Sequence, residues 1–459
     1  MAATTPANAP GLTPEARRSM YGGVISLVVD SYDIYVPAFV LPAAMGYFEP
    51  ASMSDTQQAT MTSVVFTITL LARPVGGVIF GNLGDTIGRK RITMLAGIGF
   101  TVVTLVIACL PGYSLWGYGA LGTLIALRFI GGVFLGGGYA GPVPLAIERS
   151  PARLRGPVGG VIAAGAGVAV FFISLVQLTA LEPMAPDAYT TWGWRLPFFF
   201  GVLLGIGYLI YYARVREVDV ESLAKDRATK RQPLMELLAG PQLRNLLQVF
   251  LLMTGMWFAA QMLVSFLPSL LIQVLHQDPA DVTVLEIVMS VITSASMIAL
   301  ATLSQRVGRR AVLFWTAATS TVCASAAFAF MVMLAMNGSP FLAVAVLAIV
   351  ASVFVNGPLG TIVVYLNERF GRGVRSSGYG TAYTVSLILP SLYSVWIGLL
   401  DNVMPFEYAP VVLIAVGGLL FAIGARIGPE TVTGGTLAAE DAAAAPATTT
   451  PAAAEGGSA

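Results

Sequence analysis

Gly81-Asn82-Leu83-Gly84-Asp85-Thr86-Ile87-Gly88-Arg89-Lys90-Arg91 stands between two long apolar stretches, and its pattern returns 220 positions later as Leu303-Ser304-Gln305-Arg306-Val307-Gly308-Arg309-Arg310. With the same shift and no gap, Glu148, Arg149 and Arg155 fall on Glu368, Arg369 and Arg375. Two separate basic segments repeat at one spacing, which indicates an internal duplication. In a membrane protein, duplicated halves can rock against each other around a site at their interface, so the repeat suggests a transporter.

The composition indicates a membrane protein. Of the 459 residues, 56% are hydrophobic and only 11% are charged, and the mean hydropathy is +0.78. A soluble fold could not cover so much apolar surface. Apolar runs of about 17 to 25 residues or more can span a bilayer as helices. We therefore predict an all-α membrane protein with twelve transmembrane helices in two six-helix pseudo-repeats, at 20–47, 57–82, 92–111, 118–144, 157–181, 195–214, 246–273, 282–304, 311–336, 341–366, 377–400 and 408–427.

Basic residues predict the orientation, because Lys and Arg near span ends stay on the cytoplasmic side. Of 25 Lys and Arg residues, 22 lie in the leader, alternate loops and the tail, and the other three are Arg73, Arg128 and Arg195. All 22 fall on one side only if twelve spans leave both termini inside. We therefore predict a multi-pass protein of the inner (plasma) membrane with cytoplasmic termini.

The predicted halves cover residues 20–214 and 246–428, and the polar residues 215–245 between them are interpreted as a cytoplasmic linker. The leader 1–19 and the tail 429–459 lack the apolar mass to fold and are expected to be disordered. The first apolar run has no small-residue cleavage pattern, so we expect a retained span rather than a signal peptide.

Few residues suit metal or nucleophile chemistry. Cys109 and Cys323 fall inside apolar spans of different halves, where packing is the simplest role. The single histidine, His276, falls in an outer loop, which argues against His-based metal sites and most His general-base catalysis. We expect no metal, no cofactor and no nucleic-acid partner.

Several motifs carry a family resemblance. Gly81 to Lys90 resembles the loop between helices 2 and 3 of the major facilitator superfamily, which implies its fold, and Arg128-Phe129-Ile130-Gly131-Gly132 resembles the helix 4 motif. Three further segments are similar to the metabolite:proton symporter branch: Ala72-Arg73-Pro74-Val75-Gly76-Gly77, Trp194-Arg195-Leu196-Pro197-Phe198, and Asp30-Ser31-Tyr32-Asp33 in place of Glu-x-Tyr-Asp. Where the branch usually has Gly-Gly-Glu in helix 4, this chain has Gly136-Gly137-Gly138.

Four ionisable side chains are predicted deep in the membrane, where a charge is costly and therefore suggests a function. Counting about 1.5 Å per residue, Asp30, Asp33, Arg73 and Arg128 fall about 13 to 20 Å deep in a core about 30 Å thick. Asp30 and Asp33 are three residues apart and share a helix face. The alternative is a set of buried salt bridges that only hold the first half together.

Charge counting favours coupling to protons. Arginine does not readily lose its proton, whereas burial and a neighbouring carboxylate favour the protonated form of an aspartate. We therefore predict Asp33 as the proton carrier and Asp30 as its tuning partner. Arg73 and Arg128 are predicted to contact a substrate carboxylate, because a released guanidinium can bind two oxygens at once. Proton and anion would then bind best together, which is symport.

Other polar or aromatic side chains in the spans could shape the pocket, although a lone Gln or Tyr more often makes an interhelical hydrogen bond. Beside the arginines we select Tyr32, Gln261 and Asn356 as binding candidates; the wider set adds Tyr35, Tyr139, Gln177, Trp257 and Tyr383. Glu286 lies about one turn inside its helix, so an interfacial position is expected.

The cytoplasmic motifs are predicted to form a gate. By the resemblance, Asp85 would face the start of helix 11, where Ser376 and Ser377 offer a cap and backbone N–H groups favour an anion. The second half has Gln305 at the corresponding position, so the gate is expected to depend mainly on the first copy. The remaining gate candidates are Arg89, Glu148 and Arg155.

Three functions are compatible with these features. Proton-coupled uptake of a small organic acid or zwitterion by a monomer in the bilayer fits best, with a carboxylate as the expected substrate. Drug:proton antiporters of the superfamily carry Gly-Pro deep in helix 5, whereas Gly156-Pro157 lies at its entrance, which disfavours an exporter. A membrane enzyme with a metal on Asp30 and Asp33 would need further carboxylates or phosphate-binding groups that we do not find, so no enzyme is expected.

Overall fold

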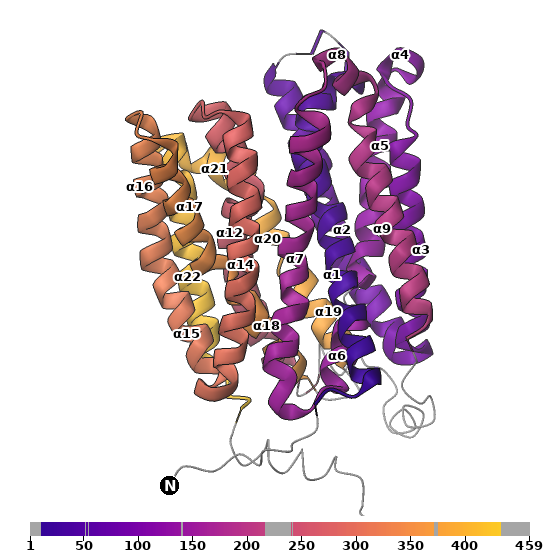
Figure 1. Ribbon diagram of the computed structural model, residues 1–459, viewed down its shortest axis with the longest axis vertical. Coiled ribbons are helices and arrows are strands. Elements are labelled where there is room, and N and C mark those ends of the chain that lie inside the picture. The colour runs from indigo at the N-terminus through magenta and orange to yellow at the C-terminus, as the bar shows by residue number, and fades with distance from the viewer. Residues whose placement is uncertain are drawn as a thin grey trace, which may run out of the picture.

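The computed structural model describes residues 11–50, 52–53, 55–138, 141–215, 240, 242–370 and 375–432. Within these residues, twelve helices are long and apolar enough to cross a membrane, which confirms the predicted number. They run side by side along the long axis of the molecule (Figure 1). The prediction of an all-α membrane protein is therefore confirmed.

The first half contains six spans, one of them built from two helices: α1 (Pro14–Val40), α2 (Asp55–Ile87), α3 (Arg89–Ala108), α5 (Tyr118–Gly138) with α6 (Pro142–Glu148), α7 (Arg155–Val176) and α9 (Arg195–Ala213). Two short helices, α4 (Tyr113–Trp116) and α8 (Pro186–Ala188), lie in its loops. The second half contains the other six: α12 (Leu243–Gln261) with α13 (Leu267–Ser269), α14 (Pro279–Val307), α15 (Arg309–Thr319) with α16 (Ser325–Met336), α17 (Phe341–Asn356) with α18 (Leu359–Arg369), α19 (Arg375–Val385) with α20 (Ile388–Ser391) and α21 (Tyr393–Leu400), and α22 (Ala409–Ile427).

The duplicated motif is a duplicated turn. Gly88 separates α2 from α3 with φ 116°, and Gly308 separates α14 from α15 with φ 105°. Backbone at such positive φ is accessible to glycine but strained for other L-residues. The repeat therefore preserves the residue that lets the chain reverse between two spans in each half.

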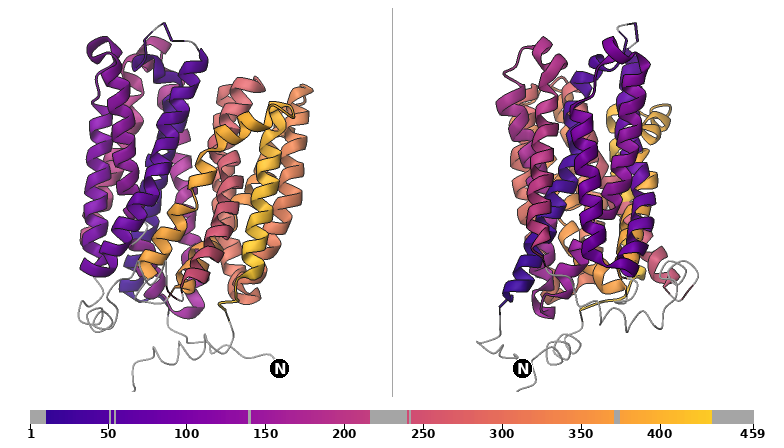
Figure 2. Two further views of the ribbon diagram at one scale, coloured as in Figure 1. Left: turned by 180° about the vertical axis from the view of Figure 1, so that it is seen from behind. Right: turned by 90° about the vertical axis from the view of Figure 1, so that its right-hand side faces the viewer.

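The two halves meet closely at one end and part at the other. At one end of the molecule α1 begins, α22 ends and the turns at Gly88 and Gly308 lie. We call this end the basic end. In Figures 1 and 2 the indigo-to-magenta half and the salmon-to-yellow half converge there and diverge toward the end that carries α4 and α8. Contacts between the halves run chiefly between α7 and α14 and between α2 and α19.

The folded part extends beyond the predicted limits at both ends. The first helix begins at Pro14 rather than residue 20, because Thr13 caps it by accepting a hydrogen bond from the Ala16 amide at 3.2 Å. The tail contributes Glu430, whose carboxylate accepts hydrogen bonds from the amides of Arg309 (2.8 Å) and Arg310 (3.0 Å) at the start of α15. Most of the predicted linker and tail, residues 216–239, 241 and 433–459, lies outside the described residues.

Candidate functional site

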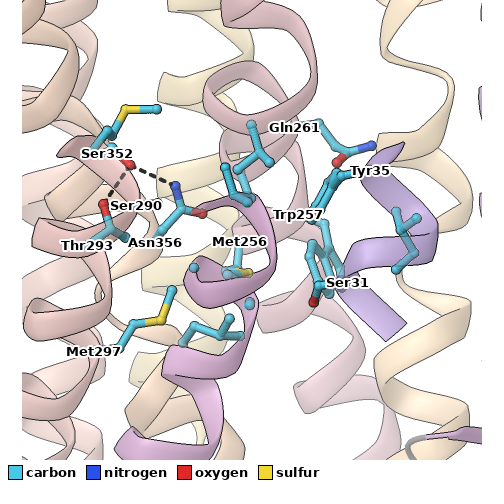
Figure 3. Close-up of a pocket in the computed structure, with 18 of the residues that line it drawn as sticks. Ser31, Tyr35, Met256, Trp257, Gln261, Ser290, Thr293, Met297, Ser352 and Asn356 are labelled. Carbon is cyan, nitrogen blue, oxygen red and sulfur yellow. Dashed lines mark hydrogen bonds between the residues drawn. The ribbon is translucent and has the colours of Figure 1, made fainter. Parts of the chain in front are cut away.

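A cavity with a volume of about 70 Å³ accessible to water lies between the two halves. Helices α1, α2 and α7 of the first half and α12, α14, α17 and α19 of the second half contribute to its wall (Figure 3). The site is therefore created by the interface, and a ligand bound in it would contact both halves.

Each helix presents one face to the cavity. On α14, Glu286, Ser290, Thr293 and Met297 lie three or four residues apart, and on α12 Trp257 and Gln261 are four apart. Residues at these spacings stack on one side of a helix.

Arg73 of α2 is the basic residue among the described residues that line this cavity. Its Nη2 donates to both carboxylate oxygens of Asp30 on α1, at 3.0 Å to Oδ1 and 3.1 Å to Oδ2. Both side chains are buried, with 1% and 4% of their surface exposed. The two charges compensate each other, which is the condition for keeping them out of water.

The second predicted pair lies inside the first half. Arg128 Nη2 donates to the Asp33 carbonyl oxygen at 3.0 Å and approaches Asp33 Oδ2 at 3.5 Å. Arg128 Nε donates to Thr69 at 3.1 Å, and the Thr104 hydroxyl donates to Asp33 Oδ1. Neither Arg128 nor Asp33 lines the cavity. The expected four-membered cluster is therefore two separate pairs, and Arg128 is not brought to the cavity.

Tyr32 also points away from the cavity, contrary to its selection as a binding candidate. Its hydroxyl donates to the Pro197 carbonyl oxygen at 3.0 Å, which fixes α1 against α9. The neighbouring aromatic Tyr35 lines the cavity instead, four residues after the cavity-lining Ser31. Ser31, Ile34 and Tyr35 line the cavity together, at the three- and four-residue spacings of one helix face.

Gln261 and Asn356 do line the cavity, together with Trp257 and Tyr383. Asn356 donates to Ser352 at 3.2 Å, and Ser352 lies 3.1 Å from the Thr293 hydroxyl (Figure 3). Gln261 Oε1 accepts from Ser265 at 3.3 Å, whereas its buried Nε2 has no hydrogen-bond partner among the described residues. That nitrogen is a donor available to a ligand. Gln177 lies further out, and Tyr139 is outside the described residues.

The position of Glu286 near the helix start predicted a side chain at the membrane surface, but the structure buries it between the two halves. It is 1% exposed and lines the cavity. It also lines a vestibule with a volume of about 640 Å³ accessible to water. This vestibule extends past α8, toward the end of the molecule opposite the basic end. Distance from a helix end predicted depth in a bilayer but not burial between two halves.

The basic end holds the ion pair Glu148–Arg375, with Oε1 and Nη1 at 2.9 Å. Glu148 ends α6 of the first half and Arg375 begins α19 of the second, so the pair joins the two halves. Arg155, another gate candidate, begins α7 at the same end. The side chains of Asp85 and Arg89 lie outside the described part of the structure. The described neighbour Gly84 packs against the start of α19, since a Cβ on it would lie 3.2 Å from Ser376 Oγ.

The second copy of the motif makes hydrogen bonds to the first half. Gln305, at the position equivalent to Asp85, accepts from the Gly156 amide at 3.0 Å and donates to the Ala152 carbonyl oxygen at 3.1 Å. It thereby binds the start of α7 in the other half. That the gate depends mainly on the first copy stays a prediction, because the side chain of Asp85 lies outside the described residues.

Across the described residues, no three His, Cys, Asp or Glu side chains gather closely enough to hold a metal ion. The charged groups at the cavity are instead a guanidinium and carboxylates, which suit ion pairing and proton exchange.

Comparison with known proteins agrees with this geometry. The family model of the Major Facilitator Superfamily matches residues 23–394. The inner membrane metabolite transport protein YhjE of Escherichia coli is 30% identical over 81% of this chain and 84% of that protein. The proline/betaine transporter of Salmonella typhimurium is 26% identical over 93% of this chain and 86% of that protein. The shikimate transporter of Escherichia coli is 31% identical over 49% of this chain and 52% of that protein.

The fold is that of solved transporters. The proton:xylose symporter XylE matches with a TM-score of 0.74 at 15% identity, over 91% of this chain and 96% of that one. The human organic anion transporter MFSD10 matches with a TM-score of 0.66 at 13% identity, over 90% of this chain and all of that one (100%).

Proposed function

We propose that this chain, which belongs to the major facilitator superfamily, takes up a small organic acid or zwitterionic metabolite together with protons by alternating access. The superfamily consists of transporters rather than enzymes. The observation that carries the proposal is the buried Asp30–Arg73 pair, because Arg73 also lines the cavity between the halves. A substrate held there contacts both halves, so their relative motion can expose it to either side.

Coupling follows from the chemistry of the pair. Asp30 can be neutralised by a proton, whereas Arg73 keeps its charge. Protonation of Asp30 would therefore release Arg73 to bind a substrate carboxylate, and loss of the substrate would favour return of the proton to water. This geometry favours Asp30 over Asp33 as the proton carrier beside the substrate. Asp33 and Arg128 would then brace α1 against α5 and α3.

The size of the cavity limits the substrate. With a volume of about 70 Å³, the cavity holds several water molecules, which suits a small solute. Proline, betaine and shikimate, the cargoes in the names of similar proteins, are small molecules with one carboxylate. Their shared carboxylate, which Arg73 could bind, supports a small monocarboxylate over a sugar.

The orientation of the protein in the membrane is inferred from the positions of its basic residues. If the basic end is cytoplasmic, as positively charged span ends favour, both termini lie inside, in an inner-membrane protein. The large vestibule at the opposite end would then open outward, while Glu148–Arg375 and Gln305 close the cytoplasmic side. An outward-open cavity with a compensated arginine is a state ready to receive a proton and a substrate.

The test is uptake into proteoliposomes with an imposed pH gradient, screened over carboxylates, aromatic acids, betaines and sugars. We expect a small carboxylate or zwitterion to accumulate. Asp30→Asn should abolish accumulation but retain exchange of labelled for unlabelled substrate, because only the proton step is lost. Accumulation by Asp30→Asn with pH as the sole driving force would refute this coupling.

A further inference from the structure

Glu286 has no role in the coupling mechanism, yet it is the second charged side chain of the cavity. Among the described residues that line the cavity, Arg73 and Glu286 are the only basic and acidic ones. Arg73 belongs to α2 of the first half and Glu286 to α14 of the second half. The cavity therefore places a basic and an acidic side chain on walls that belong to different halves.

The Glu286 carboxylate has no compensating group within the described structure. Both of its oxygens are buried without a hydrogen-bond partner among the residues described, and no Arg, Lys or His there lies within ion-pair distance. A buried carboxylate without a partner is costly. Its position between the vestibule and the cavity would bring an entering cation directly to it.

The aromatic side chains of the cavity suit an organic cation. Tyr35, Trp257 and Tyr383 line the cavity, and the rings of Trp257 and Tyr383 meet edge to face with centroids 5.2 Å apart. Aromatic faces attract ammonium groups, most strongly where water is excluded. A hydrated metal ion would instead seek several oxygen ligands, and no acidic cluster occurs in the described residues.

We propose that Glu286 is the subsite for the positively charged nitrogen of a zwitterionic substrate, an amino acid or a betaine, whose carboxylate binds Arg73. This inference rests on the proposed function, since it specifies the substrate class of the same cavity. A zwitterion would compensate both walls at once, whereas a simple monocarboxylate would leave Glu286 unpaired.

The test compares two pairs of ligands that differ only in the cationic centre: glycine betaine with 3,3-dimethylbutanoate, and proline with cyclopentanecarboxylate. Dissociation constants are measured by calorimetry on the full chain in lipid nanodiscs. We expect the wild type to prefer at least one zwitterion over its analogue, in which a carbon replaces the charged nitrogen, by about 30-fold or more, the scale typical of a desolvated charge pair. Glu286→Gln should weaken binding of that zwitterion by about 30-fold and change binding of its analogue by less than about threefold.

Glu182→Gln is the matched control, because Glu182 lines the vestibule beside Thr283 but not the cavity. It should change neither constant by more than about threefold. Equal binding of each pair by the wild type, unchanged zwitterion binding by Glu286→Gln, or no zwitterion binding up to about 10 mM would overturn the proposal. The assay needs no pH gradient, so lost proton coupling would not affect it. Coupled uptake of simple carboxylates alone would overturn the zwitterion site and leave the proposed function intact.

Discussion

Removing the Glu148 carboxylate should open the basic end. Glu148 Oε1 and Arg375 Nη1 are 2.9 Å apart, and their side chains are 17% and 18% exposed. At that distance the attraction is about 6 kcal/mol in an effective dielectric near 20. Desolvation and side-chain ordering cancel most of it, so about 1 to 2 kcal/mol should remain. Glu148→Gln should therefore shift the equilibrium toward the open basic end by about 5- to 30-fold.

The assay is the labelling rate of Ser377→Cys in purified protein. Ser377 is buried at the start of α19, where the Cβ position of Gly81 lies 3.2 Å from its Cα. Native Cys109 and Cys323 are exposed and must first be replaced. Labelling should rise about 5- to 30-fold in Glu148→Gln, because the thiol becomes accessible only when the two halves separate at this end.

Glu368 provides the matched control. It is the repeat equivalent of Glu148, but it pairs at 3.3 Å with Arg309 within the second half. Glu368→Gln should therefore leave labelling within about twofold of the parent. Exchange of the two charges, Glu148→Arg with Arg375→Glu, should restore slow labelling. Unchanged labelling in Glu148→Gln, or an equal rise in Glu368→Gln, would refute the gate assignment.

Three further results are expected. Arg73→Lys should weaken carboxylate binding by about 10-fold or more, with only a small loss of melting temperature. Arg128→Lys should instead lower the melting temperature and leave binding within about threefold. Equal affinity losses in the two variants would contradict the separation of the two ion pairs. Gly77→Val should increase Ser377→Cys labelling, because a Cβ there would overlap the Thr384 hydroxyl and lie 2.9 Å from the Gly380 carbonyl oxygen, while Gly207→Val, with nothing within 4 Å of its Cβ position, should not. Burial raises the pKa of Glu49, outside the spans, from near 4.5 to about 7, so its proton stabilises the folded state fully below about pH 4.5 and this stabilisation is lost as the pH rises through about 7. Glu49→Gln should accordingly increase the free energy of unfolding by about 2 to 3 kcal/mol at pH 8, but not at pH 4. A melting-temperature measurement at both pH values checks this, and equal shifts at the two values would contradict it.

The tertiary structure decided which predicted groups meet. Asp30, Asp33, Arg73 and Arg128 were all identified by their depth in apolar runs, but depth does not specify which helix faces the interface. Only Arg73 of these lines the cavity, and Arg128 is turned into the first half. Glu286 shows the converse error, because a residue near a helix end can still be buried among helices of both halves.

The sequence by itself determined the membrane class, the twelve spans, the duplication and the superfamily. These follow from local properties: apolar length is set by bilayer thickness, and a turn such as Gly88 needs glycine wherever it occurs. The cavity, the Asp30–Arg73 and Glu148–Arg375 pairs, and the isolation of Glu286 depend on helices from both halves or from distant parts of the chain. Their formation is decided by the rotation and packing of whole helices, which small-residue contacts across the interface set and which hydropathy does not encode.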